Sequence, residues 1–276
     1  MQFPIMNTLF HPSTAVRRAL PLAVLLLAGA TGFAADLQHA RDGSGVYGYK
    51  DTPKLPFCDY LVHDCDRPAP KRVDPGKAGP PQPAPSDAIV LFDGKDLSQW
   101  EPTEYRMVDG CVEAVGGSAF RTKQEFGSYQ LHLEWQAPAG FKGEWYNQGN
   151  NGVMLMGLFE IQIFDSYNEK IYPDGMAAAV YGQTPPLVNA TRPPGEWQTY
   201  DIYFTAPVFE GGKLAHPARL TMLHNGVLVH LNTPIYGETG HRILPEYKQK
   251  TTKGPLAFGA HNCPVRFRNI WLRPLP

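Results

Sequence analysis

The sequence predicts an all-β protein built as a two-sheet antiparallel β-sandwich. Glycine and proline contribute 27 residues each to a chain of 276, well above the roughly 12% that is usual for the pair, so turns must be frequent. Short apolar or alternating segments recur between these turn residues, as in known sandwiches. No window long enough for a helix repeats its apolar residues every 3.6 positions, which argues against a helical bundle.

Two segments carry the clearest strand patterns. In residues 129–136, Leu131, Leu133 and Trp135 point to one face and polar residues to the other, as in a half-buried strand. Residues 218–231 hold the pair Asn225-Gly226 between apolar runs, which predicts a hairpin. The other predicted strands complete a sandwich of about ten to twelve; they cover residues 88–92, 107–114, 152–158, 159–165, 198–204, 255–260 and 265–272.

Composition limits the classes of partner. Hydrophobic residues make up 43% of the chain, which is enough for one substantial core. The net charge is −1, and no long run of lysine or arginine occurs. Nucleic-acid binding is therefore not expected, because it depends on concentrated positive charge.

Residues 1–35 are predicted to be a secretory signal peptide. Arg17 and Arg18 precede an apolar run over residues 19–30, and small residues lead to Asp36, which is the order of a signal sequence. The alternative is an uncleaved N-terminal anchor, although the run is shorter than the roughly 20 residues that span a membrane. No second apolar span follows, so we expect an exported protein, periplasmic or secreted, that is soluble after removal of the signal.

Residues 36–86 are predicted to be an irregular, proline-rich extension that precedes one sandwich domain over residues 87–276. Seven prolines in residues 68–85 favour an extended, polyproline-like linker.

The four cysteines are interpreted from their spacing. Export permits disulfides, and Cys58 and Cys65 lie close enough in sequence for a local bridge. The alternative for this segment is a metal site that uses its histidine and aspartates, His63, Asp64 and Asp66. Cys111 and Cys263 are expected to be buried and unpaired.

One strand presents a carboxylate beside a carboxamide. The period of two in residues 159–165 directs Ile161 and Ile163 to the core, and Glu160 and Gln162 to the opposite face. This face is suited to line the concave sheet of a carbohydrate-binding sandwich; the alternative is that Glu160 is an ordinary solvated residue. Retaining and inverting glycosidases use two opposed carboxylates, and Gln162 stands where the second is expected.

Loops supply the other candidates. The glycine-rich loop 142–152 offers aromatic and amide side chains for stacking and hydrogen bonding: Trp145, Tyr146, Asn147, Asn150 and Asn151. The alternative is a structural loop in which asparagines adopt left-handed conformations. Tyr181 and Arg192 lie in the segment 181–197, where Arg192 either holds a substrate oxygen or pairs with Glu196.

A histidine follows one of the last predicted strands. His261 stands beside Asn262 and is followed by Arg266 and Arg268. It is either catalytic or structural.

Seven segments together resemble one family, and their order spans residues 89–275. The chain is similar to the secreted DUF1080 proteins, also called the 3-keto-disaccharide hydrolase domain family. The resemblance implies a concanavalin A-like jelly roll. The segments are IVLFDGKDLSQW, FGSYQLHLEW, NNGVMLM, FEIQIFDS, NATRPPGEWQTYDIYF, LHNGVLVH and HNCPVRFRNIWLRPL.

The resemblance also implies a reaction. Family members cleave glycosides that a separate sugar 3-oxidoreductase has already oxidised at C3. The ketone acidifies the C2 proton, so that one base removes it, the enolate expels the C1 group, and water adds afterwards. This route needs a base and an enolate stabiliser rather than two carboxylates.

Under this resemblance, each candidate has an expected role. Glu160 or His261 is the base, and Arg192 or Arg268 stabilises the enolate. A divalent metal is an alternative electrophile, although the sequence has no dense ligand motif. Hydroxyl positioning is expected from Gln162 and Asn151, and stacking on the sugar ring from Trp145 and Tyr181.

Two other functions remain open from sequence. One is a non-catalytic, lectin-like carbohydrate-binding module, and the other is an ordinary glycan hydrolase. Convergence of Glu160 and His261 in one cleft, with Arg192 or Arg268 nearby, is expected for an enzyme, whereas placement on opposite sheets favours binding or structure.

Overall fold

A computed structural model describes residues 36–276. The signal peptide predicted for residues 1–35 lies outside the described residues. Across residues 36–276, no helix has the length and hydropathy that crossing a membrane would require.

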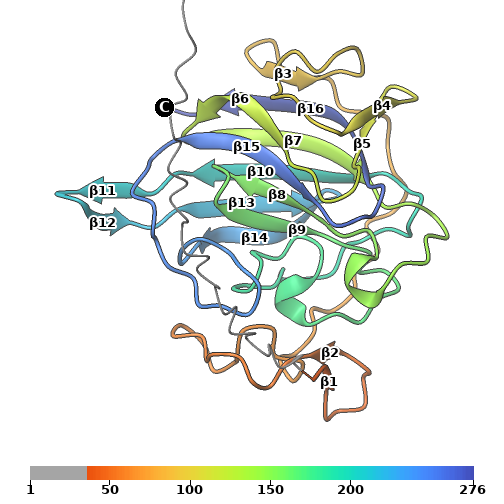
Figure 1. The fold of residues 1–276 in the computed structure, drawn as a ribbon, viewed down its shortest axis with the longest axis vertical. Helices are drawn as coiled ribbons and strands as arrows, with labels where there is room; N and C mark the ends of the chain where they lie inside the picture. Colours follow the sequence, from red (N-terminus) through yellow and green to blue (C-terminus); the bar gives the residue numbers. More distant parts are fainter. Residues whose placement is uncertain (1–35) are drawn as a thin grey trace, which may run out of the picture. The chain divides into compact units, whose positions relative to one another are not determined.

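The predicted antiparallel sandwich is confirmed, with one eight-stranded and one four-stranded sheet (Figure 1). The large sheet has the order β14 (Val227–Pro234), β13 (Arg219–His224), β10 (Gln198–Thr205), β7 (Tyr129–Gln136), β16 (Arg266–Pro274), β5 (Cys111–Glu113) and β4 (Arg106–Val108), and β3 (Ile89–Phe92) also pairs with β16. The small sheet has the order β6 (Phe120–Phe126), β15 (Gly254–Ala260), β8 (Asn151–Leu155) and β9 (Phe159–Ile163).

Tight turns set the register of two hairpins in the large sheet. Asn225 and Gly226 have φ values of 54° and 78° and join β13 to β14, as predicted. Asp109 and Gly110, at 51° and 71°, join β4 to β5. Positive φ at both central residues is the requirement of a type I′ turn, whose twist matches that of the strands.

Strands outside the predicted set are short or polar. β6 carries mostly charged or polar side chains, and the hairpin of β11 (Val208–Glu210) and β12 (Lys213–His216) is largely exposed and projects from the sandwich (Figure 1). β1 (Gln38–His39) pairs with β2 (Tyr47–Gly48) in the extension. The sequences of all these strands lack the alternation that marks a half-buried strand.

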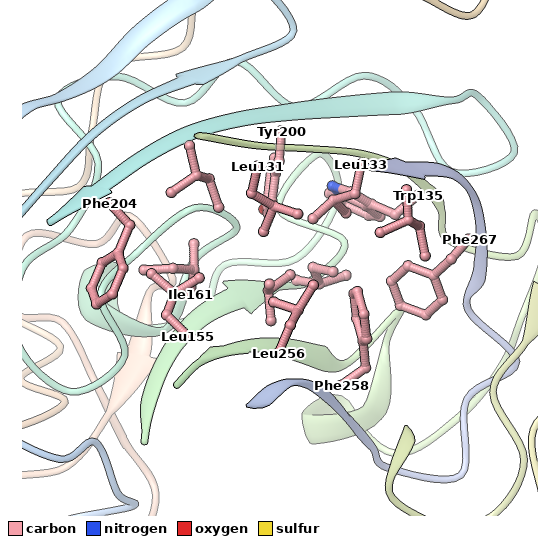
Figure 2. Packing of buried hydrophobic residues seen from close by; sticks show 14 of the residues in the cluster. Leu131, Leu133, Trp135, Leu155, Ile161, Tyr200, Phe204, Leu256, Phe258 and Phe267 are labelled. Atoms are coloured by element: carbon pink, nitrogen blue, oxygen red, sulfur yellow. The ribbon is translucent and has the colours of Figure 1, made fainter. Parts of the chain in front are cut away.

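The core fills the space between the sheets (Figure 2). Leu131, Leu133 and Trp135 of β7 are fully buried on the inner face of the large sheet, as their alternation predicted. Ile161 of β9 and Phe258 of β15 face them from the small sheet. Burial of such side chains stabilises the fold by roughly 1.5–3 kcal/mol each, and it fixes which residues of β9 point outward.

The proline-rich part of the extension is extended and tied to the sandwich. Val73 N–H donates to the carbonyl of Asn189 over 2.9 Å, and Asn189 N–H donates to Lys71 over 3.0 Å. Further along, the Asn269 amide donates to the carbonyl of Gln82. Hydrogen bonds therefore hold residues 71–82 along the domain.

The predicted Cys58–Cys65 bridge is wrong: both thiols are free, as are those of Cys111 and Cys263. Cys65 is buried in a small apolar cluster with Ala40 and Val46, whereas Cys58 is only partly buried. Cys111 and Cys263 are buried, as expected.

The alternative metal site in the same segment is not formed either. Lys50 forms ion pairs with Asp64 and Asp66, and Arg41 bonds to Asp66. His63 points elsewhere, to Asp174. Within residues 36–276, no group of three or more His, Cys, Asp or Glu side chains is arranged to hold a metal ion.

Candidate active site

A pocket of about 440 Å³ lies on the outer face of the small sheet, over β9. Its volume is at the lower end of the range for small-molecule sites. Residues from six parts of the chain line it: Tyr49 of the extension, Trp145, Tyr146 and Asn150 of the glycine-rich loop, Glu160 and Gln162 of β9, Ile171, Tyr172 and Tyr181 of the segment after β9, Gly240 and His241, and His261 after β15.

Glu160 is the one acidic side chain among these lining residues. β9 aims it outward because Phe159, Ile161 and Ile163 on either side are fully buried in the core. Within residues 36–276, its carboxylate accepts no hydrogen bond and forms no ion pair. Burial without a partner disfavours the charged form and raises the pKa of Glu160 to about 7.

The neighbouring strand makes room for this carboxylate. Gly152 on β8 lies beneath it, and a β-carbon there would overlap Glu160 Oε1. Asn151 fixes the backbone at this point: its Oδ1 accepts from Gly152 N–H over 2.8 Å, and its Nδ2 donates to the Tyr105 hydroxyl over 3.1 Å. Asn151 is itself fully buried, so it supports the floor rather than contacting a ligand.

Phenols and an imidazole form a hydrogen-bonded cluster in the pocket. The Tyr181 hydroxyl lies 3.1 Å from the Tyr172 hydroxyl and 2.9 Å from His241 Nδ1. Burial raises the pKa of both tyrosines, so they remain neutral donors. Desolvation, with the nearby His63 and Arg242, lowers the pKa of His241 to about 4, so its imidazole is neutral at pH 7.

A buried Asp–His pair lies behind this cluster. Asp174 Oδ2 accepts from the His63 backbone N–H over 2.9 Å, and its Oδ1 lies 3.3 Å from His63 Nδ1. Both side chains are fully buried. Burial alone would raise the pKa of Asp174, but the contacts with His63 lower it. The His63 ring packs 4.2 Å from Tyr172 and 5.1 Å from His241, centroid to centroid.

Five of the eight predicted site residues line this one pocket. Glu160 and His261 converge there, with Gln162, Trp145 and Tyr181. His261 stands at the exposed rim, and partial loss of water lowers its pKa. Tyr146 and Asn150 of the glycine-rich loop also line the pocket, as do Tyr49, Tyr172 and His241, which the sequence analysis did not select.

The structure does not bring the two predicted arginines to the pocket. Arg192 is buried elsewhere, where its guanidinium donates to Asn225 Oδ1 over 2.6 Å and to the carbonyls of Trp197 and Gly76. These acceptors use its donors, so the predicted role of Arg192 as an enolate stabiliser is wrong for this arrangement. It does not pair with Glu196 either.

Arg268 lies on the outer face of the large sheet. It is opposite Glu134 in the β16–β7 register and pairs with it at 2.7 Å, and its guanidinium covers Trp197. Beside it, His132 Nδ1 lies 2.7 Å from Asp201 Oδ1. Arg268 therefore belongs to an ion network on the large sheet, in which Glu134 and His132 are buried, and not to the pocket.

Comparison with known proteins identifies similar domains. A family model described as a 3-keto-alpha-glucoside-1,2-lyase-like domain matches residues 87–273. A crystal structure of a glycosyl hydrolase candidate from Parabacteroides distasonis ATCC 8503 is 42% identical, with a TM-score of 0.67, and the match covers 70% of this chain and 85% of that one.

Two more structures of glycosyl hydrolase candidates from the same bacterium share the fold. Their identities are 18% and 22%, each with a TM-score of 0.51, and the matches cover 69% and 68% of this chain and 94% and 99% of theirs. No curated protein matches the sequence.

Proposed function

Because the chain belongs to the 3-keto-alpha-glucoside-1,2-lyase-like family and is a glycosyl hydrolase-like, carbohydrate-active domain, we propose that it cleaves glycosides oxidised at C3. The substrates are 3-keto-glycosides and 3-keto-disaccharides. The observation that carries this proposal is the single unpaired carboxylate of Glu160, in a pocket whose other polar groups are neutral phenols, imidazoles and amides.

Glu160 is the proposed base. A carboxylate with a pKa near 7 is ionised in a substantial fraction of molecules at neutral pH and is basic enough to accept a carbon-bound proton made acidic by a neighbouring ketone. It takes the C2 proton, and the C2–H electrons form the enolate with the C3 carbonyl.

The enolate oxygen is the atom that needs stabilisation. In place of the predicted arginines, the Tyr181 hydroxyl is the proposed donor, supported by Tyr172 and by neutral His241. Preorganised donors in a site with little water are effective at stabilising such charge. The enolate then re-forms the ketone, the C1–O bond breaks, and the departing oxygen takes a proton.

His261 is the proposed proton relay to the departing group: its neutral imidazole donates a proton from one ring nitrogen to the departing oxygen while the other ring nitrogen takes a proton from water. It stands at the rim, where the second half of a disaccharide would extend toward solvent. Water then adds to the resulting 2-hydroxy-3-keto-glucal and gives the 3-keto sugar. Gln162 and Asn150, which line the pocket, are the proposed partners of the sugar hydroxyls, and Trp145 is proposed to stack on the ring.

The substrate requires a preceding oxidation. A separate oxidoreductase must convert a sugar C3 alcohol into the ketone before this chain acts on it. With the export signal predicted from the sequence, we propose that the cleavage takes place outside the cytoplasm.

The experiment compares oxidised and unoxidised sugars. Purified protein is incubated with 3-keto-trehalose, a 3-keto-β-glucoside and their unoxidised parents, with and without EDTA, and release of the leaving group is followed. Cleavage of the keto sugars alone is expected, with a primary kinetic isotope effect when C2 carries deuterium.

Two variants test the role of Glu160. Glu160→Gln is expected to lower kcat by at least 100-fold, whereas Glu210→Gln, which changes an exposed glutamate on β11, is expected to leave it unchanged. Cleavage of the unoxidised sugars would overturn the keto-sugar route. Sugar binding without any turnover would indicate the lectin-like alternative.

A further inference from the structure

The pocket is partly built by residues outside the region that the family model matches. That match begins at residue 87, yet Tyr49 lines the pocket and His63 packs directly behind it. Both belong to the extension. The family domain alone therefore lacks one wall of this site.

Specific contacts join the extension to pocket residues. The Tyr47 ring meets Trp145 edge-on with centroids 5.0 Å apart, and its hydroxyl donates to the Trp145 carbonyl over 3.4 Å. On the other side, Asp51 pairs with Arg242 at 2.7 Å. Arg242 follows His241 in sequence, so this ion pair holds the loop that carries a pocket imidazole.

Tyr49 occupies the centre of these contacts. Its ring lies 6.0 Å from Tyr172 and 5.5 Å from His241, and the Arg242 guanidinium covers it at 4.7 Å. Its backbone N–H donates to the carbonyl of His63 over 2.9 Å. Aromatic neighbours on several sides and a backbone bond fix the orientation of the ring, which is what a preformed ligand wall requires.

We infer that the extension is a working part of the substrate site, in which Tyr49 contacts the sugar and sets which leaving groups fit, and His63 positions Tyr172 and His241. This inference rests on the proposed function and adds to it a specificity residue from outside the family domain. An aromatic wall recognises the apolar face of a sugar ring, whereas Gln162 and Asn150 bind the hydroxyls.

The test uses substrates that differ only in the leaving group. The full-length protein is assayed on methyl 3-keto-α-glucoside and on 3-keto-trehalose. Tyr49→Ala is expected to raise KM for 3-keto-trehalose by about tenfold with kcat within threefold, and to change the ratio of kcat/KM between the two substrates. Tyr49→Phe is expected to retain the wild-type ratio.

Tyr60→Ala is the matched control, because Tyr60 lies in the same extension but does not line the pocket. It is expected to leave the substrate ratio unchanged. For His63, His63→Gln is expected to lower kcat on both substrates equally, with the ratio preserved. The inference would be overturned if Tyr49→Ala lowered kcat/KM equally for both substrates, or if its kinetics matched those of Tyr60→Ala.

Binding measurements separate this inference from the proposed function. If the wild type cleaves neither keto sugar, the proposed reaction fails. Calorimetric titration with trehalose, methyl α-glucoside and their 3-keto forms then tests whether Tyr49 contacts the sugar. Weaker binding by Tyr49→Ala than by Tyr60→Ala supports the sugar contact. Equal binding by the two variants, or no binding to the wild type, overturns it.

Discussion

The carboxylate of Glu160 lies against the α-carbon of Gly152 on the neighbouring strand, where any β-carbon would overlap its Oε1 atom. The proposed base and the glycine beneath it therefore form one unit. This relationship explains why β8 carries a glycine at a position with no unusual backbone angle to satisfy.

Gly152→Ala is expected to displace Glu160 and lower kcat by about 100-fold, while the protein still folds. The matched control is Gly259→Ala, because Gly259 is the cross-strand partner of Gly152 on β15 and a β-carbon there meets nothing within 4 Å. Steady-state rates and the thermal midpoint check both. Equal activity of the two variants would contradict the link between Gly152 and the base.

The activity is expected to rise with pH through about 7. Glu160 must be ionised to accept a proton, and its pKa is about 7, so kcat/KM should increase about tenfold per unit below that value and level off above it. An acid limb near pH 4.5, the ordinary value for a glutamate, would show that Glu160 is not desolvated as described.

Glu160 also has a predictable effect on stability. Its pKa is higher in the folded than in the unfolded protein, so the folded state binds the proton more tightly and loses stability as the pH rises from about 4.5 to 7. Glu160→Gln removes this loss. The variant is expected to have a higher melting temperature than the wild type at pH 8 and a smaller difference at pH 4.5; the same difference at both values would contradict this.

Loss of the Tyr181 hydroxyl tests the proposed enolate donor. Tyr181→Phe breaks the bonds to Tyr172 and His241 and is expected to lower kcat by about 100-fold, the typical effect of losing one such donor, with KM nearly unchanged. Tyr203→Phe, on the exposed face of β10, is the control. A raised KM with unchanged kcat would assign Tyr181 to binding instead.

The ion network on the large sheet makes a separate pH prediction. Burial alone would lower the pKa of His132, but hydrogen bonds and charge from Asp201 and Glu134 raise it to about 9. The resulting stability is complete below the unfolded value near 6.5 and is lost as the pH rises through 9. His132→Gln should remove roughly 3 kcal/mol of pH-dependent unfolding free energy between pH 6.5 and 10, as denaturant titrations would show. Activity at pH 7 should change little.

The sequence was sufficient to predict most strands of the sandwich and the face on which Glu160 and Gln162 lie. Both follow from alternation, because burying Ile161 and Ile163 leaves the residues between them no other direction. β6 was missed because it is an edge strand with an outward-facing side. Charged side chains at these positions obscure the alternation of apolar and polar residues by which a strand is recognised in a sequence.

The arginine roles could not be predicted, because their partners are distant in sequence. Arg192 bonds to Asn225 at the turn of a hairpin 33 positions away, and no local pattern indicates that contact. The position of Arg268 was easier to predict from the sequence. Glu134 alternates with buried Leu133 and Trp135, so it must face outward, as Arg268 does. Tyr49 and His241 were missed because only tertiary packing brings them to β9.

The extension precedes all of its pocket partners in the sequence, and this order affects when the site forms during folding. Residues 47–63 are synthesised early, but their partners Trp145, Asp174 and Arg242 are 98, 111 and 191 positions further along. Contacts across such separations form late, since loop closure must precede them. The site is therefore complete only when the loop that carries Arg242 packs against the extension, and refolded protein should regain catalysis no earlier than its near-ultraviolet signal.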